Sequence, residues 1–211
     1  MRIVSLTKET TRDILDNLLK RSPNNYGKYE SAVAEILANV KTKGDEALFS
    51  YTKEFDKAEI TAETIKVTEE EIQEAYSLVD PALINVIRKA LVNIRSYHEK
   101  QKQNSWFTSD TDGTMLGQKV TALERVGVYV PGGKAVYPSS VLMNIVPAKV
   151  AGVDQIVMTT PPGKDGKINP STLVAAKEAG ADEIYKVGGA QAIGALAYGT
   201  ESIPKVDKIV G

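Results

Sequence analysis

Cysteine is absent from this chain of 211 residues, and histidine occurs once. Without cysteine the chain can form no disulfide, thiolate–zinc site or iron–sulfur cluster, and it has no cysteine nucleophile. A zinc site needs several ligands that converge, so the single histidine, His98, fits a packing or helix-end role better than a metal site. These shortages exclude several common kinds of metal and thiol chemistry.

A net charge is also nearly absent, because 26 basic residues are balanced by 27 acidic ones. Such a chain has no field to attract nucleic acid or an anionic membrane, and three Phe and one Trp offer little surface for base stacking. The sequence contains no apolar run of transmembrane length and no signal peptide. We therefore expect a cytoplasmic protein that binds neither nucleic acid nor a membrane.

The first half of the sequence has the apolar spacing of helices. The apolar stripes lie at 14–19, 33–40, 48–55 and 83–94. Repeated stripes of this kind predict helices that pack on one another or on a further part of the protein.

Several helix ends can be located from capping residues. Gly44 is predicted to end one helix, and Asp45 to cap the next. Thr68 and Glu71 have the spacing of a capping box, which predicts a helix from about residue 69. Asp80 precedes a proline, the usual arrangement of an N-cap followed by the first helical residue.

From residue 105 to 125 the composition changes. The turn signal Asp112-Gly113 lies between two short strand-like runs and predicts a β-hairpin that connects two parts of the chain. We place the domain boundary after this hairpin. The expected domains are a helical N-terminal region with its hairpin connector over 1–125, and a second domain over 126–211.

Strand-like and helical runs alternate from residue 126 onward. Strands are predicted at 126–130, 155–160, 183–187 and 206–210, and helices at 138–151, 170–179 and 190–198. This alternation is typical of a parallel sheet with right-handed crossovers, so the predicted fold class is α/β. Pro147 is expected to kink or split the first of these helices. No crossover helix or covering layer follows the last strand, which predicts a sheet that has been cut short.

Two of the predicted strands end in paired glycines. Gly132-Gly133 and Gly188-Gly189 each precede a helix, where free backbone N–H groups and a helix N-terminus suit a phosphate. The glycines are adjacent, so the spacing of the G-x-G-x-x-G fingerprint is not met. Glycine pairs that only allow a tight turn are an equally good interpretation.

Tyr129 and Gln191 are the side chains that would complete a nucleotide site at these turns. Tyr129 lies at the carboxyl end of one strand and Gln191 at the start of a helix after another, and open parallel sheets bind ligands at that edge. Tyrosine could stack on or bond to an adenosine group, and glutamine could hold a ribose or an amide. Each also has a plainer interpretation, namely a packed strand aromatic for Tyr129 and local bonding at a helix start for Gln191.

Six blocks of the sequence resemble the histidinol dehydrogenase family. They are GDEAL at 44–48, FD at 55–56, VGVYVPGG at 126–133, PA at 147–148, VGGAQAI at 187–193 and YGTESIPKVDKIVG at 198–211. Together they span nearly the whole chain and resemble the N-terminal part of family members, which are considerably longer. The resemblance therefore implies a truncated chain, and it accounts for a last strand with nothing after it.

The resemblance implies an oxidoreductase that converts L-histidinol, through a bound aldehyde, to L-histidine in histidine biosynthesis. In the family two hydrides pass to NAD, a zinc ion holds the substrate, and a glutamate–histidine pair moves protons. The zinc ligands and that pair belong to a later segment of the family, so no catalytic and no metal-binding residue is expected here. The residues carried over are two NAD contacts, Tyr129 and Gln191.

The fold implied by the resemblance is an incomplete Rossmann-like sheet of aldehyde-dehydrogenase-like architecture, in a homodimer whose active site uses both subunits. This chain alone is then expected to be inactive. The alternative is a non-enzymatic nucleotide-binding or assembly module that is complete at Gly211. A covalent mechanism of the aldehyde-dehydrogenase type would need a cysteine, which the chain lacks.

Overall fold

The structure is a computed structural model and describes residues 5, 7–19, 27–132 and 136–211. It consists of two compact units, Met1–Glu35 and Ile36–Gly211. The first unit contains helix α1 (Lys8–Leu19) and the start of helix α2 (Gly27–Lys43). Both helices match the apolar stripes of the sequence, and Gly44 follows the end of α2 as predicted.

A four-stranded parallel sheet forms the centre of the second unit. Its strands are β3 (Arg125–Tyr129), β4 (Gln155–Thr160), β5 (Glu183–Lys186) and β6 (Lys208–Val210), in the order β5-β4-β3-β6. In the paired register Val126 lies beside Ile156 on one side and Lys208 on the other. All four strands were predicted: the bounds of β4 match, and those of the other strands differ by at most two residues. The α/β fold class is confirmed.

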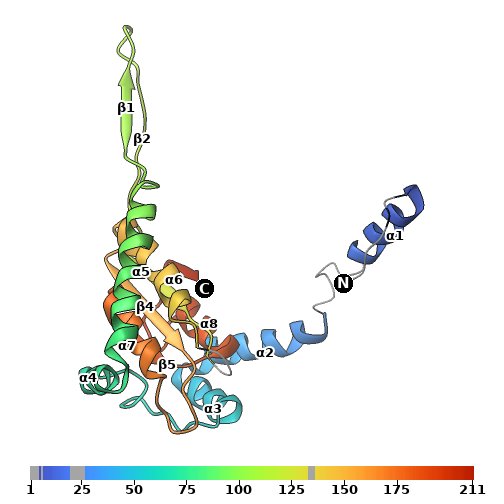
Figure 1. Cartoon of the computed structure of the whole chain (residues 1–211), viewed down its shortest axis with the longest axis vertical. Helices are drawn as coiled ribbons and strands as arrows, with labels where there is room; N and C mark the ends of the chain where they lie inside the picture. The colour runs from blue at the N-terminus through green and yellow to red at the C-terminus, as the bar shows by residue number, and fades with distance from the viewer. Residues whose placement is uncertain (1–4, 6, 20–26, 133–135) are drawn as a thin grey trace. The chain divides into compact units, whose positions relative to one another are not determined.

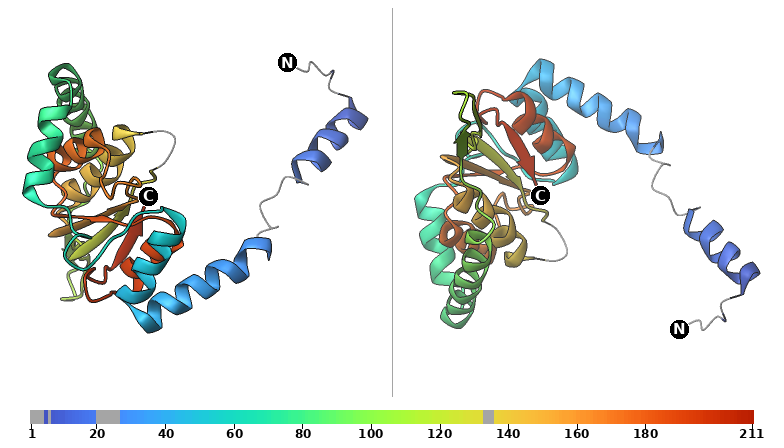
Figure 2. Two further views of the ribbon diagram at one scale, coloured as in Figure 1. Left: turned by 90° about the horizontal axis from the view of Figure 1, so that it is seen from below. Right: turned by 90° about the horizontal axis from the view of Figure 1, so that it is seen from above.

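Helices cover both faces of this sheet (Figure 2). Helices α6 (Pro138–Ala151) and α7 (Pro170–Ala179) pack on one face, where Val128, Ile156 and other buried residues form the larger core. Helix α8 (Gly189–Tyr198) packs on the opposite face over a second core. Buried residues on both faces account for the near-continuous apolar sequence of the strands.

The helices that precede the sheet in sequence form an outer layer. Helices α4 (Glu69–Leu78) and α5 (Pro81–Glu99) pack on α6 and α7, and α3 (Asp45–Phe55) packs on α8. The segment that joins α3 to α4 runs antiparallel to β5, with Val67 N donating to Ile184 O at 2.9 Å and Lys186 N donating to Ile65 O at 2.9 Å. This segment pairs the outer edge of β5.

Two of the predicted helix starts are confirmed in detail. Thr68 and Glu71 form the full capping box of α4, and the Asp80 carboxylate accepts a hydrogen bond from Ala82 N at the start of α5. The prediction that Asp45 caps α3 is wrong. Gly44 is the N-cap residue, and the Glu201 carboxylate accepts the 2.8 Å hydrogen bond from Asp45 N.

The Asp45 side chain forms other hydrogen bonds, because the Glu201 carboxylate already bonds to the start of α3. It accepts hydrogen bonds from the hydroxyl and the backbone N–H of Ser202, so residues 201–202 are fastened to α3. Helix α6 continues through Pro147 without interruption, so the expected split is not found.

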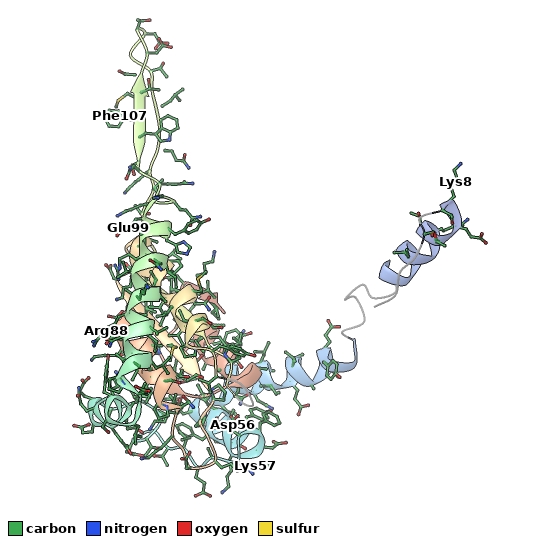
Figure 3. The ribbon with its side chains drawn as sticks, viewed as in Figure 1. Lys8, Asp56, Lys57, Arg88, Glu99 and Phe107 are labelled. Atoms are coloured by element: carbon green, nitrogen blue, oxygen red, sulfur yellow. The ribbon has the colours of Figure 1, made fainter. Side chains whose placement is uncertain are left out.

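The predicted hairpin is present between α5 and β3. Strands β1 (Trp106–Ser109) and β2 (Met115–Gln118) pair antiparallel, and every residue of both strands is exposed. The hairpin extends from the end of α5, as Figure 1 shows. Phe107, at 81% exposed, is among its most exposed side chains (Figure 3). The domain boundary between residues 125 and 126 stays a prediction. None of the described helices is long and apolar enough to span a membrane.

Candidate functional site

The strand order creates a topological switch point at the carboxyl edge of the sheet. Strands β3 and β6 are neighbours, yet the chain leaves β3 into α6 on one face and reaches β6 from α8 on the other. The order β5-β4-β3-β6 corresponds to the first four strands of the Rossmann order 3-2-1-4-5-6, in which dinucleotides bind outside the carboxyl ends of the strands. The candidate site therefore lies where β3, β4 and β5 end.

Tyr129 is the last residue of β3 and is partly buried at this edge. Its hydroxyl oxygen accepts a 3.3 Å hydrogen bond from the backbone N–H of Gly189, the first residue of α8. The structure thus brings the two glycine-rich turns named by the sequence to one place, with Tyr129 bridging them. Residues 133–135, which belong to the first turn, lie outside the described residues.

Gln191 lies in the first turn of α8 and is 1% exposed. Neither its amide oxygen nor its amide nitrogen has a hydrogen-bond partner among the described residues. A β-carbon on Gly189 would lie 2.6 Å from the Gln191 Oε1 atom, so the amide lies against the helix start. The plainer interpretation, in which the Gln191 side chain bonds locally, receives no support from the described contacts.

Thr159 is a site residue that the sequence analysis did not identify. It is the strand partner of Tyr129, is fully buried, and its hydroxyl has no hydrogen-bond partner among the described residues. By strand alternation it faces the same side as Val157, which packs in the α8 core. The alternation could have revealed that Thr159 shares a strand face with Val157.

The loops after three strands meet at Pro161. A β-carbon on Gly132 would lie 2.6 Å from the Cγ atom of Pro161, and one on Gly188 would lie 2.5 Å from its Cβ atom. Glycine at both positions therefore lets the chain after β3 and β5 close onto the chain after β4. The resulting edge is compact because its backbones approach closely.

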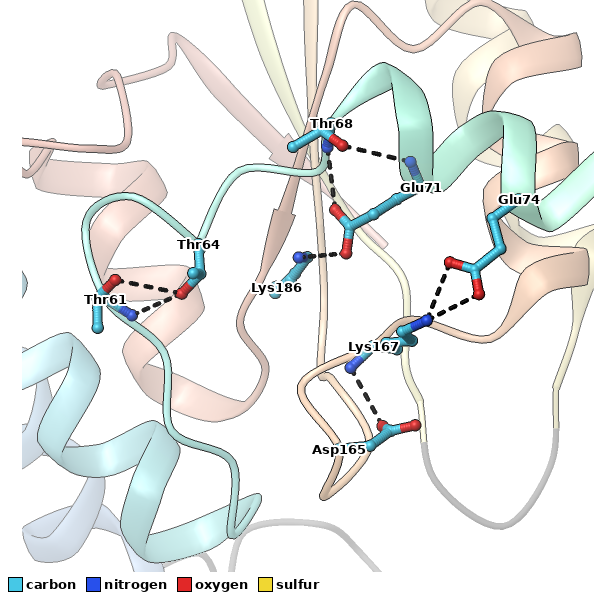
Figure 4. Close-up of polar contacts among 8 residues, drawn as sticks. All are labelled: Thr61, Thr64, Thr68, Glu71, Glu74, Asp165, Lys167 and Lys186. Atoms are coloured by element: carbon cyan, nitrogen blue, oxygen red, sulfur yellow. Dashed lines mark hydrogen bonds and ion pairs between the residues drawn. The ribbon is translucent and has the colours of Figure 1, made fainter.

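A charged side chain at this edge, that of Lys186, is already paired. Lys186, whose side chain is 7% exposed, forms a 2.6 Å ion pair with Glu71 of α4 (Figure 4). Burial raises the pKa of Tyr185, and the neighbouring Glu183 carboxylate adds to the effect. The Tyr185 hydroxyl donates a 3.0 Å hydrogen bond to that carboxylate. The Lys186–Glu71 pair thus joins β5 to α4, whereas the Tyr185–Glu183 contact lies within β5 itself.

The described residues do not fit a zinc site. No group of three or more His, Asp or Glu side chains among them is placed to hold a metal ion. His98 lies in the last turn of α5, where its Nδ1 atom is 2.7 Å from Gln101 Oε1. Among the described contacts, no carboxylate or histidine is bonded to Tyr129 or Gln191, so these contacts include no acid–base pair.

The sequence model of one family, described as histidinol dehydrogenase, matches residues 19–211. The chain belongs to the histidinol dehydrogenase family. This confirms the family resemblance on which the sequence analysis relied. The matched range includes the glycine-rich edge of the sheet.

Relatives named histidinol dehydrogenase align with most of this chain. One from Bacillus subtilis is 62% identical over 85% of this chain and 42% of its own length. One from Heliobacterium mobile is 57% identical over 93% and 46%, and one from Methanocaldococcus jannaschii is 53% identical over 99% and 48%. The chain therefore spans less than half the length of these curated relatives.

A solved structure also matches the fold. The crystal structure of histidinol dehydrogenase from Elizabethkingia anophelis has a TM-score of 0.82 to this chain at 42% sequence identity. The match covers 87% of this chain and 42% of that chain. The described α/β arrangement is thus the one found in this family.

Proposed function

We propose that this chain forms the dinucleotide-binding side of an NAD-dependent and zinc-dependent histidinol dehydrogenase. In this proposal the whole enzyme oxidises L-histidinol, through a bound aldehyde, to L-histidine. The observation that carries the proposal is the Gln191 amide, which is buried beside the start of α8 with no partner among the described residues. Leaving a polar group buried and unpaired costs about 1–3 kcal/mol, and bonds to a ligand would remove that cost.

The proposed roles follow from the positions of the two side chains. Gln191 would bond to a ribose or amide group of the dinucleotide, and Tyr129 would hold the α8 start against the end of β3. The N-terminus of α8 carries partial positive charge and favours a nearby phosphate. Bound NAD would supply the hydride acceptor, while this chain would bind and orient it.

The division of labour within the enzyme is also a proposal. Residues 126–211 would act as the dinucleotide domain, and 1–125 would support it and reach other parts of the enzyme. The zinc ligands and the proton-transferring pair would come from outside the described residues, among which no suitable cluster is found. The whole enzyme would act as a cytoplasmic homodimer with L-histidinol as its substrate.

Isothermal titration with NAD tests the binding role. We expect Gln191→Leu and Tyr129→Phe each to weaken NAD binding about 3- to 10-fold, the effect of losing one hydrogen bond. Gln118→Leu and Tyr97→Phe make the same chemical changes at exposed positions and should leave binding unchanged. Equal NAD affinity in all five proteins would remove Tyr129 and Gln191 from the site.

A second experiment tests where the chemistry lies. This chain is purified without contaminating full-length enzyme and incubated with L-histidinol and NAD, and NADH formation is followed. We expect no NADH, because the described residues offer no metal site and no acid–base pair beside the site. Steady production of NADH would contradict the proposed division of labour, even if NAD binding behaved as expected.

A further inference from the structure

Two side chains at the candidate site, those of Thr159 and Gln191, hold three buried polar atoms that have no hydrogen-bond partner. The atoms are the Thr159 hydroxyl oxygen and the oxygen and nitrogen of the Gln191 amide. Five atoms of this kind occur among the described residues, so more than half of them belong to this pair. Buried polar groups are nearly always bonded in proteins. The two residues therefore call for a common explanation.

Thr159 lies between two tyrosines on the face of the sheet that α8 covers. It is in register with Tyr129 of β3 and with Tyr185 of β5, and residues in register on neighbouring strands point to the same face. Both tyrosines pack in the core beneath α8. Their hydroxyls are bonded elsewhere, to the Gly189 N–H and the Glu183 carboxylate. The Thr159 hydroxyl thus faces α8 without bonding to either ring.

Gln191 approaches the same place from the helix. Ala195, one helical turn further on, is buried in the core that also contains Val157 of β4, so the Gln191 side chain is on the sheet-facing side of α8. Thr159 follows Val157 by two residues and points to the same face. Both side chains therefore extend this core towards the carboxyl edge, one from the strand and one from the helix.

The plainer interpretation is that Thr159 is an ordinary core threonine. Thr52 of α3 is such a residue, because it is 1% exposed and its hydroxyl donates a 2.8 Å hydrogen bond to Leu48 O. The Thr159 hydroxyl has no comparable bond among the described residues. Valine has nearly the same shape and would avoid the cost of burying an unpaired hydroxyl. A contribution to ligand binding accounts for a hydroxyl that packing does not need.

The chemistry of an amide explains what this hydroxyl can contribute. The nitrogen end of the Gln191 side chain donates hydrogen bonds and the oxygen end accepts them, so a half turn of the amide exchanges the two. A ligand bonded to one end leaves the other end free. A hydroxyl can donate or accept, so Thr159 can bond to either free end. An amide held in this way also has less freedom to lose when the ligand binds.

We propose that Thr159 is a positioning residue for Gln191. When the dinucleotide bonds to one end of the Gln191 amide, the Thr159 hydroxyl bonds to the other end and fixes the amide in that orientation. The inference rests on the proposed function, because Thr159 acts on the ligand only through Gln191. Thr159 itself makes no contact with the dinucleotide.

A double-mutant cycle tests the coupling between the two residues. The parent chain, Thr159→Val, Gln191→Leu and the double variant are each titrated with NAD by calorimetry. We expect Thr159→Val to weaken binding about 3- to 10-fold, the effect of one lost hydrogen bond. The double variant should bind no more weakly than Gln191→Leu, because Thr159 has nothing left to position. Losses that multiply would overturn the proposal, since Thr159 would then act independently of Gln191.

A comparison of valine with serine separates positioning from a general structural role. Thr159→Val removes an unpaired hydroxyl, so it should raise the melting temperature of the chain without NAD by about 2–4 °C. Thr159→Ser keeps the hydroxyl but loses a buried methyl group, so it should lower the melting temperature and bind NAD like the parent chain. The less stable variant would then be the better binder. Weaker binding by both variants, in step with lower melting temperatures, would overturn the proposal.

Thr52→Val is the matched control. It makes the same chemical change at a buried threonine, but the hydroxyl that it removes is already bonded to Leu48 O. It should leave NAD affinity unchanged and should not raise the melting temperature. A loss of NAD affinity equal to that of Thr159→Val would overturn the proposal, because it would then be a general effect of losing a buried hydroxyl.

Two further outcomes separate this proposal from the proposed function. If Gln191→Leu weakens NAD binding but Thr159→Val binds NAD like the parent chain, the role of Thr159 is overturned and the proposed function stands. If the parent chain does not bind NAD, both are contradicted.

Discussion

Gly188 lies so close to Pro161 that a β-carbon at position 188 would be 2.5 Å from the Cβ atom of Pro161. The backbone at Gly188 is extended, with φ at −122°, so any residue could adopt it. Glycine is required at position 188 only because there is no room for a β-carbon. This contact fixes the distance between the ends of β4 and β5, and hence the shape of the candidate site.

Replacing Gly188 with alanine should therefore destabilise the fold through a clash that a second substitution relieves. We expect Gly188→Ala to lower the free energy of unfolding by about 1–3 kcal/mol, the usual cost of overpacking. Adding Pro161→Gly should recover part of that loss, since the Cβ atom at 2.5 Å and the rest of the ring are then removed. Urea unfolding of the two single variants and the double variant measures the coupling, and strictly additive effects would contradict the contact.

Gly189 differs from its neighbour because its backbone conformation also requires glycine. Its φ is +63°, and a β-carbon there would lie 2.6 Å from Gln191 Oε1. Gly189→Ala should cost about 1–2 kcal/mol from backbone strain alone, and it should also displace the Gln191 amide. We expect a loss of NAD affinity in addition to the loss of stability.

The hairpin supplies a matched control for this substitution. Gly113 has φ at +88° with nothing within 4 Å of an added β-carbon, so Gly113→Ala introduces strain without a clash. It should cost a similar free energy of unfolding and leave NAD affinity unchanged. Equal effects of both variants on NAD affinity would show that the Gln191 amide is not involved.

The sequence predicted those features that depend on neighbouring residues. The capping box of Thr68 and Glu71 and the N-cap at Asp80 involve side chains and backbone groups within three residues of each other. The strands were predicted for a similar reason, because burial on both faces leaves an apolar run that is visible in the sequence. Tyr129 and Gln191 could be placed at one edge because parallel strands end on the same side.

The features that the sequence could not predict depend on residues far apart in the chain. The start of α3 is capped by Glu201, which lies 156 residues from Asp45, so local rules assigned the cap to Asp45 itself. The lack of a hydrogen-bond partner for the Gln191 amide likewise results from packing, and no sequence pattern indicates it.

The buried ion pair of Glu71 and Lys186 joins α4 to the end of β5. Glu71→Gln leaves the Lys186 ammonium buried without its partner charge, yet glutamine can still complete the capping box of α4. We expect a loss of about 3 kcal/mol in the free energy of unfolding, as for other broken buried pairs. Guanidinium unfolding measures the loss.

Glu69→Gln is the matched control for this prediction. Glu69 pairs with Lys177 at 2.9 Å, but both side chains are about half exposed. Solvent screens such pairs, so the loss should be clearly smaller than for Glu71→Gln. Equal losses would indicate that the Glu71–Lys186 pair contributes no more than a surface contact.

A cluster of Tyr76, Arg88 and Glu178 joins α4 and α5 to α7 and should make stability depend on pH at both ends of the scale. The Arg88 guanidinium (Figure 3) bonds to both Glu178 oxygens, and the Tyr76 hydroxyl donates a 2.8 Å hydrogen bond to the same carboxylate. Hydrogen bonding to Arg88 lowers the pKa of Glu178. Burial, with the nearby Glu178 carboxylate, raises the pKa of Tyr76 to about 12.

The two shifts act in opposite pH ranges. Because the pKa of Glu178 is lower in the folded chain, its contribution is complete above the ordinary value of 4.5 and is lost as the pH falls through the lowered pKa. Because the pKa of Tyr76 is higher in the folded chain, its contribution is complete below 10 and is lost as the pH rises towards about 12. Stability should therefore decline on both sides of a broad plateau.

Substitutions at the two residues should each remove one of these declines. Glu178→Gln is expected to cost about 1 kcal/mol at neutral pH and to flatten the acid side, with its effect limited because solvent screens the half-exposed Arg88. Tyr76→Phe should flatten the alkaline side relative to Tyr97→Phe, which changes an exposed tyrosine. Urea unfolding across the pH range measures each difference from the parent chain. An acid side unchanged by Glu178→Gln would show that the Arg88 contact does not hold α5 to α7 in solution.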